Sequence, residues 1–249
     1  IAQGKETPKS ATPGKVICKD IKAEYLQFQS KYKGDYSNLN IGIDLSNGMA
    51  ALIVKDLIPE GENVAYIYDT IDGSFPNHDP NPLVAENVEA LKALVAERGC
   101  DIGVIYDGDA DRVMFVDEKS RFIAPDLIIA LMGHYWLEKR GLKGKVLQDI
   151  RSSKSVGEYL VPMGAQMATW RVGRAFAAPK LREIDGVYGG EFAGHYYFKE
   201  FFYSDSGIMA SLIVLSILSD LKREGKTLSQ VIDKIAAYNN SGEINFKIE

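Results

Sequence analysis

Apolar residues in the first half of the chain fall into short runs that are separated by amphipathic stretches. From Leu83 to Arg98 they recur at helical spacing, and Asn81-Pro82 and Gly99 are residue types that begin and end a helix. This alternation predicts an α/β fold. Further helices are predicted at 20–31 and 49–58, and strands at 41–44, 65–68, 101–106 and 113–116.

The same alternation starts again in the second half. Thr227 and Gln230 form a predicted capping box at the start of the last helix. The repeat predicts two consecutive α/β domains, 35–122 and 123–240, with mixed, mostly parallel sheets flanked by helices. Helices are predicted at 125–140, 155–160, 207–223 and 227–238, and strands at 145–150, 165–169, 187–191 and 196–198.

Composition narrows the class of protein. Hydrophobic content of 46% and charged content of 25% over 249 residues are ordinary for a globular protein. A net charge of −5 argues against nucleic acid as a partner, and no run approaches the roughly 18 apolar residues of a membrane span. Cys18 and Cys100 are too few for a disulfide framework, so a cytoplasmic location is expected. The oligomeric state is left open.

Residues 107–112 read Asp-Gly-Asp-Ala-Asp-Arg, three carboxylates at alternate positions followed by a guanidinium. Oxygen ligands of this kind suit a hard cation such as Mg²⁺ or Ca²⁺, and without a cation the three charges would repel one another. The Arg112 guanidinium matches the geometry of phosphate oxygens. The stretch therefore predicts a metal site, formed by Asp107, Asp109 and Asp111, that faces an anionic substrate.

Two other interpretations of this stretch compete with a substrate-facing metal site. An EF-hand calcium loop would use the same three Asp and Glu118, but Arg112 occupies the position that requires Gly. The flanking residues also predict strands, where an EF-hand has helices. A solvated acidic turn needs fewer than three alternating Asp. The EF-hand is therefore excluded, and the solvated turn is the weaker alternative.

Gly189-Gly-Glu-Phe-Ala-Gly-His195 is the second stretch with candidate chemistry. Its glycines permit close backbone approach, Glu191 supplies an acceptor, and His195 titrates near neutrality. Both side chains could contact a polyhydroxylated ligand, but a glycine-rich turn with a solvated Glu191 is an equally good interpretation. For Arg171 and Arg174, beside a predicted strand end, a solvated loop and an anion contact are comparable alternatives.

The other two histidines are weaker candidates. His134 lies in a predicted apolar helix, where packing is the better interpretation. His78 lies in the proline-rich stretch Phe75–Pro82, which predicts a structural loop. Neither is predicted to take part in chemistry.

Four stretches together resemble the α-D-phosphohexomutase family, and within it the phosphomannomutase/phosphoglucomutase group. Residues 107–112 resemble its metal loop, Asp-Gly-Asp-x-Asp-Arg. Residues 190–195 resemble its sugar-recognition loop, Gly-Glu-x-Ser-Gly-His, with Ala193 in place of Ser. Residues 41–48 and 75–82 resemble segments of its second domain. The resemblance covers nearly the whole chain.

The resemblance implies a mechanism. A phosphoserine donates its phosphoryl group to a hexose phosphate, the bisphosphate turns round, and the enzyme takes back the other phosphoryl group. Hexose 1-phosphate and hexose 6-phosphate thereby interconvert. Mg²⁺ is the implied cofactor, held by the three Asp and the phosphoserine. The implied catalytic residues are Arg112, which steadies the transferring group, and His195; the implied substrate-binding residues are Gly190, Glu191, His195, Arg171 and Arg174.

The chain also departs from the family, whose members have four domains and a serine loop, Thr-Ala-Ser-His-Asn-Pro. The 249 residues contain no Ser-His pair, and the resemblance covers the two middle domains. Residues 1–34 are therefore expected to be a tail and the end of a missing first domain. Residues 241–249, where Ile244, Phe246 and Ile248 alternate, are expected to start a missing fourth domain. Such a fragment is expected to bind Mg²⁺ weakly and to show no mutase turnover alone.

Two alternatives stay open. A Mg²⁺-dependent sugar-phosphate phosphatase of the haloacid dehalogenase type also uses Asp-x-Asp after a strand, with one Asp as the nucleophile. A metal or sugar-phosphate binding module would bind the same ligands without turnover. The sequence does not decide between mannose, glucose and glucosamine phosphates.

Overall fold

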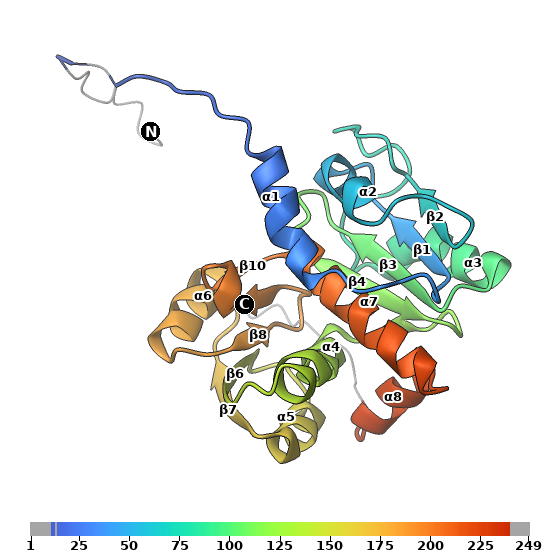
Figure 1. Cartoon of the computed structure of the whole chain (residues 1–249), viewed down its shortest axis with the longest axis vertical. Helices are drawn as coiled ribbons and strands as arrows, with labels where there is room; N and C mark the ends of the chain where they lie inside the picture. Colours follow the sequence, from blue (N-terminus) through green and yellow to red (C-terminus); the bar gives the residue numbers. More distant parts are fainter. Residues whose placement is uncertain (1–10, 13, 240–249) are drawn as a thin grey trace, which may run out of the picture.

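The computed structural model describes residues 11–12 and 14–239. Two five-stranded sheets, one in each half of the chain, lie on either side of the long helix α7, drawn in orange in Figure 1. The strand predicted at 244–248 lies outside the described residues. The described residues form two similar α/β domains that pack on one shared helix, α7.

The first sheet has the strand order β2-β1-β3-β4-β5, and only β4 runs against the direction of the others. Strands β1 and β3 are buried along their whole length, which explains why their sequences are apolar without alternation. The strands are β1 (Ile41–Asp44), β2 (Val64–Ile67), β3 (Ile102–Tyr106), β4 (Val113–Asp117) and β5 (Phe122–Ile123).

The second sheet repeats this plan with the order β7-β6-β8-β9-β10, in which only β9 is reversed. The hairpin between β8 and β9 is therefore the counterpart of the hairpin between β3 and β4. The predicted fold class, two consecutive α/β domains with mixed sheets flanked by helices, is confirmed. The strands are β6 (Gly144–Asp149), β7 (Ala165–Trp170), β8 (Tyr188–Gly190), β9 (Tyr196–Phe198) and β10 (Ser204–Asp205).

Helices flank both sheets: α3 packs on β1 and β3, and α6 packs on the strands of the second sheet. The helices are α1 (Lys22–Gln29), α2 (Val54–Leu57), α3 (Glu89–Arg98), α4 (Pro125–Leu131), α5 (Lys154–Leu160), α6 (Arg174–Glu183), α7 (Gly207–Arg223) and α8 (Leu228–Ile235). Among the described residues, no helix combines the length and the apolar character needed to cross a membrane.

Several predicted helices have different bounds. The one expected at 49–58 is a 3-10 turn over Met49–Leu52 followed by the single turn α2. The helix expected from Leu83 is a 3-10 turn over Ala85–Val88 and becomes α-helical only in α3. Asn81 is not its N-cap, because the Asn81 side chain instead closes a local turn by accepting from the N–H of Leu83 at 3.3 Å. The predicted end is confirmed by the left-handed Gly99, with φ of 59°. The helix expected over 125–140 is α-helical to Leu131, and His134–Lys139 is π-helical.

Helix α7 has the predicted bounds, and its side chains are buried on nearly all sides. A helix that is apolar all round belongs inside a core, and its residues join one apolar cluster with residues of both sheets. Two of its serine side chains bond to the first half of the chain. The Tyr106 hydroxyl donates to Ser211 Oγ at 2.5 Å, and the Ser219 hydroxyl donates to the carbonyl of Asp35 at 2.6 Å.

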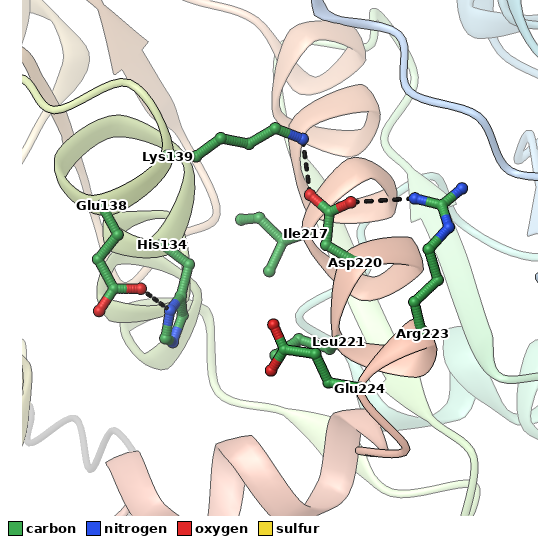
Figure 2. A pocket seen from close by; sticks show the side chains of 8 residues that line it. All are labelled: His134, Glu138, Lys139, Ile217, Asp220, Leu221, Arg223 and Glu224. Carbon is green, nitrogen blue, oxygen red and sulfur yellow. Dashed lines mark hydrogen bonds and ion pairs between the residues drawn. The ribbon is translucent and has the colours of Figure 1, made fainter.

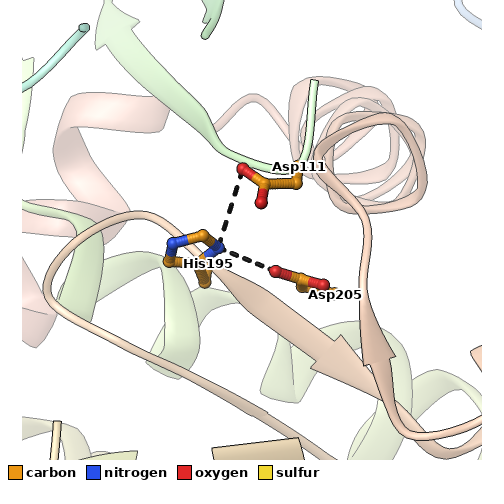
Figure 3. Close-up of side chains that lie close together, drawn as sticks. All are labelled: Asp111, His195 and Asp205. Carbon is orange, nitrogen blue, oxygen red and sulfur yellow. Dashed lines mark hydrogen bonds and ion pairs between the residues drawn. The ribbon is translucent and has the colours of Figure 1, made fainter. Parts of the chain in front are cut away.

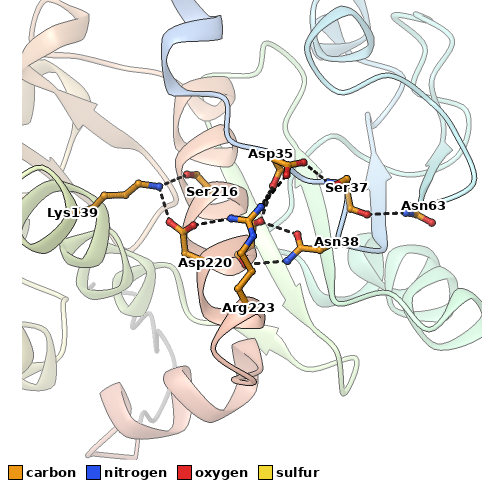
Figure 4. A network of polar contacts seen from close by, with 9 residues as sticks. Asp35, Ser37, Asn38, Asn63, Lys139, Ser216, Asp220 and Arg223 are labelled. Atoms are coloured by element: carbon orange, nitrogen blue, oxygen red, sulfur yellow. Dashed lines mark hydrogen bonds and ion pairs between the residues drawn. The ribbon is translucent and has the colours of Figure 1, made fainter.

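Ion pairs connect the C-terminal part of α7 to both halves (Figure 4). Asp220 pairs with Lys139 at 2.6 Å and with Arg223 at 3.0 Å, and Arg223 also reaches the Asp35 carboxylate at 3.0 Å. Exposed pairs of this kind contribute little individually, about 0–1 kcal/mol. The burial of α7 is therefore the main connection between the halves.

Leu215, fully buried in α7, tests whether the two halves depend on this helix. We expect Leu215→Ala to lower the free energy of unfolding by about 2–5 kcal/mol and to leave a single transition. The measurement is urea unfolding followed by far-UV circular dichroism, which reports both halves, and by tryptophan fluorescence, which reports Trp136 and Trp170 in the second half.

The control is Val161→Ala, at a side chain that is 55% exposed, which should change stability by less than about 0.5 kcal/mol. Two separate transitions in the wild type, or an equal effect of both substitutions, would contradict a shared core.

Candidate active site

The two corresponding hairpins meet at the N-terminal end of α7. Arg112 and His195 form an isolated antiparallel bridge, and the N–H of Val113 donates to the carbonyl of Gly194 at 3.3 Å. The N–H of Gly207, the first residue of α7, donates to the carbonyl of Ala110 at 3.2 Å. The repeated topology therefore places the predicted metal loop and the predicted sugar loop side by side.

The metal loop brings three carboxylates together as the sequence predicts. Oxygens of Asp107, Asp109 and Asp111 lie within 4.8 Å of one another. Asp107 is buried and accepts from Arg112 twice, from the Nε at 2.7 Å and from the backbone N–H at 3.2 Å. Ala110, with φ of 64°, supplies the left-handed turn between the second and third Asp.

The electrostatics of the loop favour a bound cation. Burial raises the pKa of Asp111 to about 6; His195 opposes this rise, and Asp107 and Asp109 add to it. A carboxylate in this state is destabilised by its neighbours, and a divalent ion between them would offset that cost. An all-oxygen donor set fits Mg²⁺ or Ca²⁺.

His195 belongs to an ion-pair network rather than to a second metal site (Figure 3). Its Nδ1 lies 2.8 Å from Asp205 Oδ2 and 3.8 Å from Asp111 Oδ1. The other oxygen of the buried Asp205 accepts from Arg174 Nε at 2.7 Å, so both oxygens are occupied. Burial lowers the pKa of His195, but the carboxylates of Asp205, Asp111 and Glu191 outweigh it and raise the pKa above its ordinary value.

Glu191 is buried beside this network. Its Oε1 accepts from the N–H of Gly173 at 3.0 Å, at the start of α6, and burial raises its pKa. The predicted alternative of a solvated Glu191 is therefore wrong. Gly190 needs to be small, because a Cβ there would lie 2.8 Å from Ile129 Cγ1 in the core. Asp149, the last residue of β6, fixes the backbone of the predicted sugar loop by accepting from the N–H of Phe192 at 3.1 Å.

The two arginines predicted to contact an anion have different surroundings. Arg174 is half exposed and held by Asp205. Arg171 is exposed, and its guanidinium stacks on Phe176, 3.6 Å from the ring centroid, and lies 5.9 Å from that of Trp170. Stacking orders the Arg171 side chain without neutralising its charge.

Three residues of the site have no clear signal in the sequence. Asp205 and Asp149 are single carboxylates at the last positions of β10 and β6, and only their burial and partners in space show their role. Gly207 resembles an ordinary helix start after Ser206, whose hydroxyl accepts from the N–H of Met209 at 3.1 Å. An acidic residue directly before a Ser-Gly helix start is the one pattern that could have directed attention to Asp205.

A groove of about 500 Å³ lies elsewhere, between the π-helical residues 134–139 and the C-terminal part of α7 (Figure 2). Its charged side chains are paired with one another: His134 with Glu138 at 2.5 Å, and Lys139 with Asp220. It contains none of the predicted site residues. The interpretation of His134 as a packed residue agrees with its hydrogen bond to the Tyr159 hydroxyl at 2.8 Å.

Comparisons with known proteins agree with this architecture. Residues 18–120 match the family described as phosphoglucomutase/phosphomannomutase, alpha/beta/alpha domain II, and residues 124–238 match domain III. A phosphomannomutase of Methanocaldococcus jannaschii is 32% identical over 231 residues, which are 92% of this chain and 50% of that protein.

Solved structures show the same similarity. A phosphoglucomutase/phosphomannomutase family protein of Burkholderia thailandensis has a TM-score of 0.75 at 25% identity, over 85% of this chain and 46% of that chain. Aspergillus fumigatus N-acetylphosphoglucosamine mutase, in complex with GlcNAc-6P and magnesium, shares the fold with a TM-score of 0.57 at 16% identity, over 86% and 49% of the two chains.

The fold is that of two consecutive α/β/α domains of the phosphoglucomutase/phosphomannomutase type. The chain belongs to the α-D-phosphohexomutase family, in the phosphoglucomutase/phosphomannomutase group. It spans about half the length of the curated relatives that it matches.

Gly207→Ala tests the contact between α7 and the metal loop. A Cβ at this position would lie 2.8 Å from the backbone carbonyl oxygens of both Ala110 and Arg112, which cannot move without displacing the loop. Although Ala favours helices by about 1 kcal/mol, we expect this substitution to lower the melting temperature.

The matched control is Gly157→Ala in α5, where the nearest neighbour of the new Cβ would be Met167 Cγ at an ordinary 3.4 Å. This control should be neutral or stabilising. Equal melting temperatures for the two variants would show that the metal loop does not constrain the helix start.

Proposed function

We propose that the chain carries the metal-binding and sugar-binding parts of a phosphohexomutase. The reaction interconverts hexose 1-phosphate and hexose 6-phosphate, with mannose or glucose as the sugar, through a phosphoserine and a bisphosphate intermediate. The main support is the meeting of the two hairpin loops, which places Asp111 Oδ1 3.8 Å from His195 Nδ1. A metal-bound phosphoryl group and a sugar hydroxyl would then be neighbours.

In this proposal Mg²⁺ is held by Asp107, Asp109 and Asp111. When bound, the ion neutralises charge on the phosphoryl group during transfer. The magnesium in the Aspergillus fumigatus relative supports this choice of ion. Arg112, oriented by Asp107 through its Nε, directs the rest of its guanidinium to the transferring phosphoryl oxygens.

The sugar is held by the second loop. Glu191 accepts hydrogen bonds from sugar hydroxyls, and the close-packed Gly190 sets its position. His195, held by Asp205, contacts the sugar near the reacting oxygen and assists proton transfer. Arg174 and the stacked Arg171 bind the substrate as part of a loop that contributes to the choice of sugar.

The proposed domain division remains 35–122, which carries the metal loop, and 123–240, which carries the sugar loop. The 249 residues contain no serine loop of the family type, so we propose that they bind ligands without completing the mutase cycle. Hexose phosphate is the proposed partner, with neither nucleic acid nor membrane involved. The unpaired cysteines Cys18 and Cys100 support a cytoplasmic setting.

A phosphatase of the haloacid dehalogenase type is disfavoured by one observation. Its nucleophile would be the first Asp of the loop, but Asp107 is buried and both its oxygens accept from Arg112. A carboxylate held in this way is a poor attacking group. A release of inorganic phosphate from hexose phosphates by this chain would favour the phosphatase.

The metal site is tested by titration calorimetry with Mg²⁺. We expect weak binding by the wild type and at least about tenfold weaker binding by Asp109→Asn, because one anionic ligand is lost while the side-chain size is kept. Glu97→Gln, at an exposed residue of α3, is the charge-matched control and should bind like the wild type. Indistinguishable isotherms for wild type and Asp109→Asn would exclude the site.

The sugar loop is tested by binding of mannose 6-phosphate and glucose 1-phosphate. Glu191→Gln should weaken both by about tenfold or more, because a charged acceptor is lost at a buried position. Glu183→Gln, at the exposed end of α6, is the control.

In the same preparation, a coupled assay with glucose 1-phosphate should show no turnover. Robust mutase activity of the 249 residues, or unchanged binding by Glu191→Gln, would overturn this part of the proposal.

A further inference from the structure

His78, in the proline-rich segment 75–82, has surroundings that a merely structural loop does not require. Its ring is nearly buried, with Nδ1 2.8 Å from the carbonyl oxygen of Asp79 and Nε2 3.1 Å from Asp44 Oδ2. The Asp44 side chain is fully buried at the end of β1. The edge of the ring meets the ring of Tyr68 at a centroid distance of 5.4 Å.

This geometry specifies the charge of the ring. A backbone carbonyl can only accept a hydrogen bond, and so can a carboxylate. Hydrogen bonds to both acceptors need a proton on each ring nitrogen, so the geometry favours an imidazolium paired with Asp44. The hydrogen bond to Asp44 raises the pKa of His78 above its ordinary value, against the opposing effect of burial, and the contact with Asp79 adds to the rise.

The turn that follows Asp44 contacts the metal loop directly. Asp44 accepts from the N–H of Ser46 at 2.7 Å and so closes a turn in which Ser46 and Asn47 have φ of 50° and 53°. This turn ends at Met49, whose N–H donates to the carbonyl of Gly108 at 2.9 Å. The turn lies so close that a Cβ on Gly48 would be 2.7 Å from that same oxygen.

The His78 end reaches the same loop from its other side. Pro80 lies against Gly108, where a new Cβ would be 3.4 Å from the proline ring. Asn81 Oδ1 lies 3.5 Å from Arg112 Nη1. The Asn77 amide also donates to Asn47 Oδ1 at 2.7 Å, so the two segments are joined beside the ion pair.

We propose that His78 is a positioning residue: its doubly protonated ring, paired with Asp44, clasps segments 44–49 and 75–81 around Gly108 and thereby sets the geometry of the metal loop. This goes beyond the proposed function and depends on it only where Mg²⁺ binding is the readout. The His78–Asp44 pair therefore makes the Mg²⁺ affinity of the metal loop depend on pH through a group that is not itself a metal ligand.

The sign of this dependence follows from the direction of the pKa shift. The charged and polar groups that face the ring are the Asp44 carboxylate, the Asp79 carbonyl and carboxylate, and the Tyr68 ring. Because the pKa of folded His78 is raised, the stabilisation is fully present below the unfolded value of about 6.5. It is lost as the pH rises through the folded pKa.

Nuclear magnetic resonance of the ring nitrogens tests the charge in the wild type, without any variant. The signals of His78 are assigned by their absence from the spectrum of His78→Gln. We expect both ring nitrogens of His78 to be protonated at about pH 7, where an ordinary histidine is largely neutral. A neutral His78 ring at that pH would overturn the proposal.

Mg²⁺ affinity and urea unfolding test the positioning role. At about pH 6, His78→Gln should bind Mg²⁺ about tenfold more weakly than the wild type, because one side of the clasp is lost. The difference should disappear as the pH rises past the His78 midpoint. His134→Gln, which removes a histidine from the distant groove, should follow the wild type throughout.

The outcomes separate this proposal from the proposed function. If the wild type binds no Mg²⁺, the proposed metal site is wrong. The His78–Asp44 ion pair is then tested by unfolding alone: His78→Gln should have a lower free energy of unfolding than the wild type only below the His78 titration midpoint. Equal Mg²⁺ affinities of the wild type and His78→Gln at about pH 6, where the ring should be charged, would refute the positioning role. A stability loss that does not vary with pH would refute the ion pair.

Discussion

The contact between the start of α7 and the metal loop is the constraint on which the site depends. Gly207 donates to the carbonyl of Ala110 and leaves no room for a side chain against Ala110 and Arg112. The rest of α7 is buried between the two sheets. One buried helix therefore fixes the position of the metal loop relative to the second half of the chain, which carries the predicted sugar loop.

Buried carboxylates, each paired with a basic side chain, support the loops that meet at this contact. Asp107 holds Arg112, Asp205 holds His195, and Asp44 holds His78. A buried pair is costly to form, and breaking one by removing a partner costs about 3–5 kcal/mol. Such pairs are better explained by the orientation they give to Arg112, His195 and the turn after Asp44 than by a gain in folding stability. The site is therefore pre-organised by charge, on a scaffold held together by apolar packing.

Much of the fold could be predicted because it depends on local patterns. The bounds of α7, the capping box at Thr227 and the end of α3 at Gly99 follow from apolar periodicity and from end residues. Prediction failed where local signals conflicted. No helix was predicted over α6, which contains Pro179 and begins at Arg174, yet the segment is helical because its apolar side packs on the second sheet.

The sequence by itself determined which candidate ligand groups are present, because three alternating Asp and a Gly-Glu-x-x-Gly-His stretch are local patterns. Only the tertiary structure decided which of these groups are neighbours. Arg112 and His195 are far apart in the sequence, and their bridge arises because two sheets with the same topology lie on either side of α7. The raised pKa values of His78 and His195 likewise depend on carboxylates distant in the sequence, whose positions no local pattern encodes.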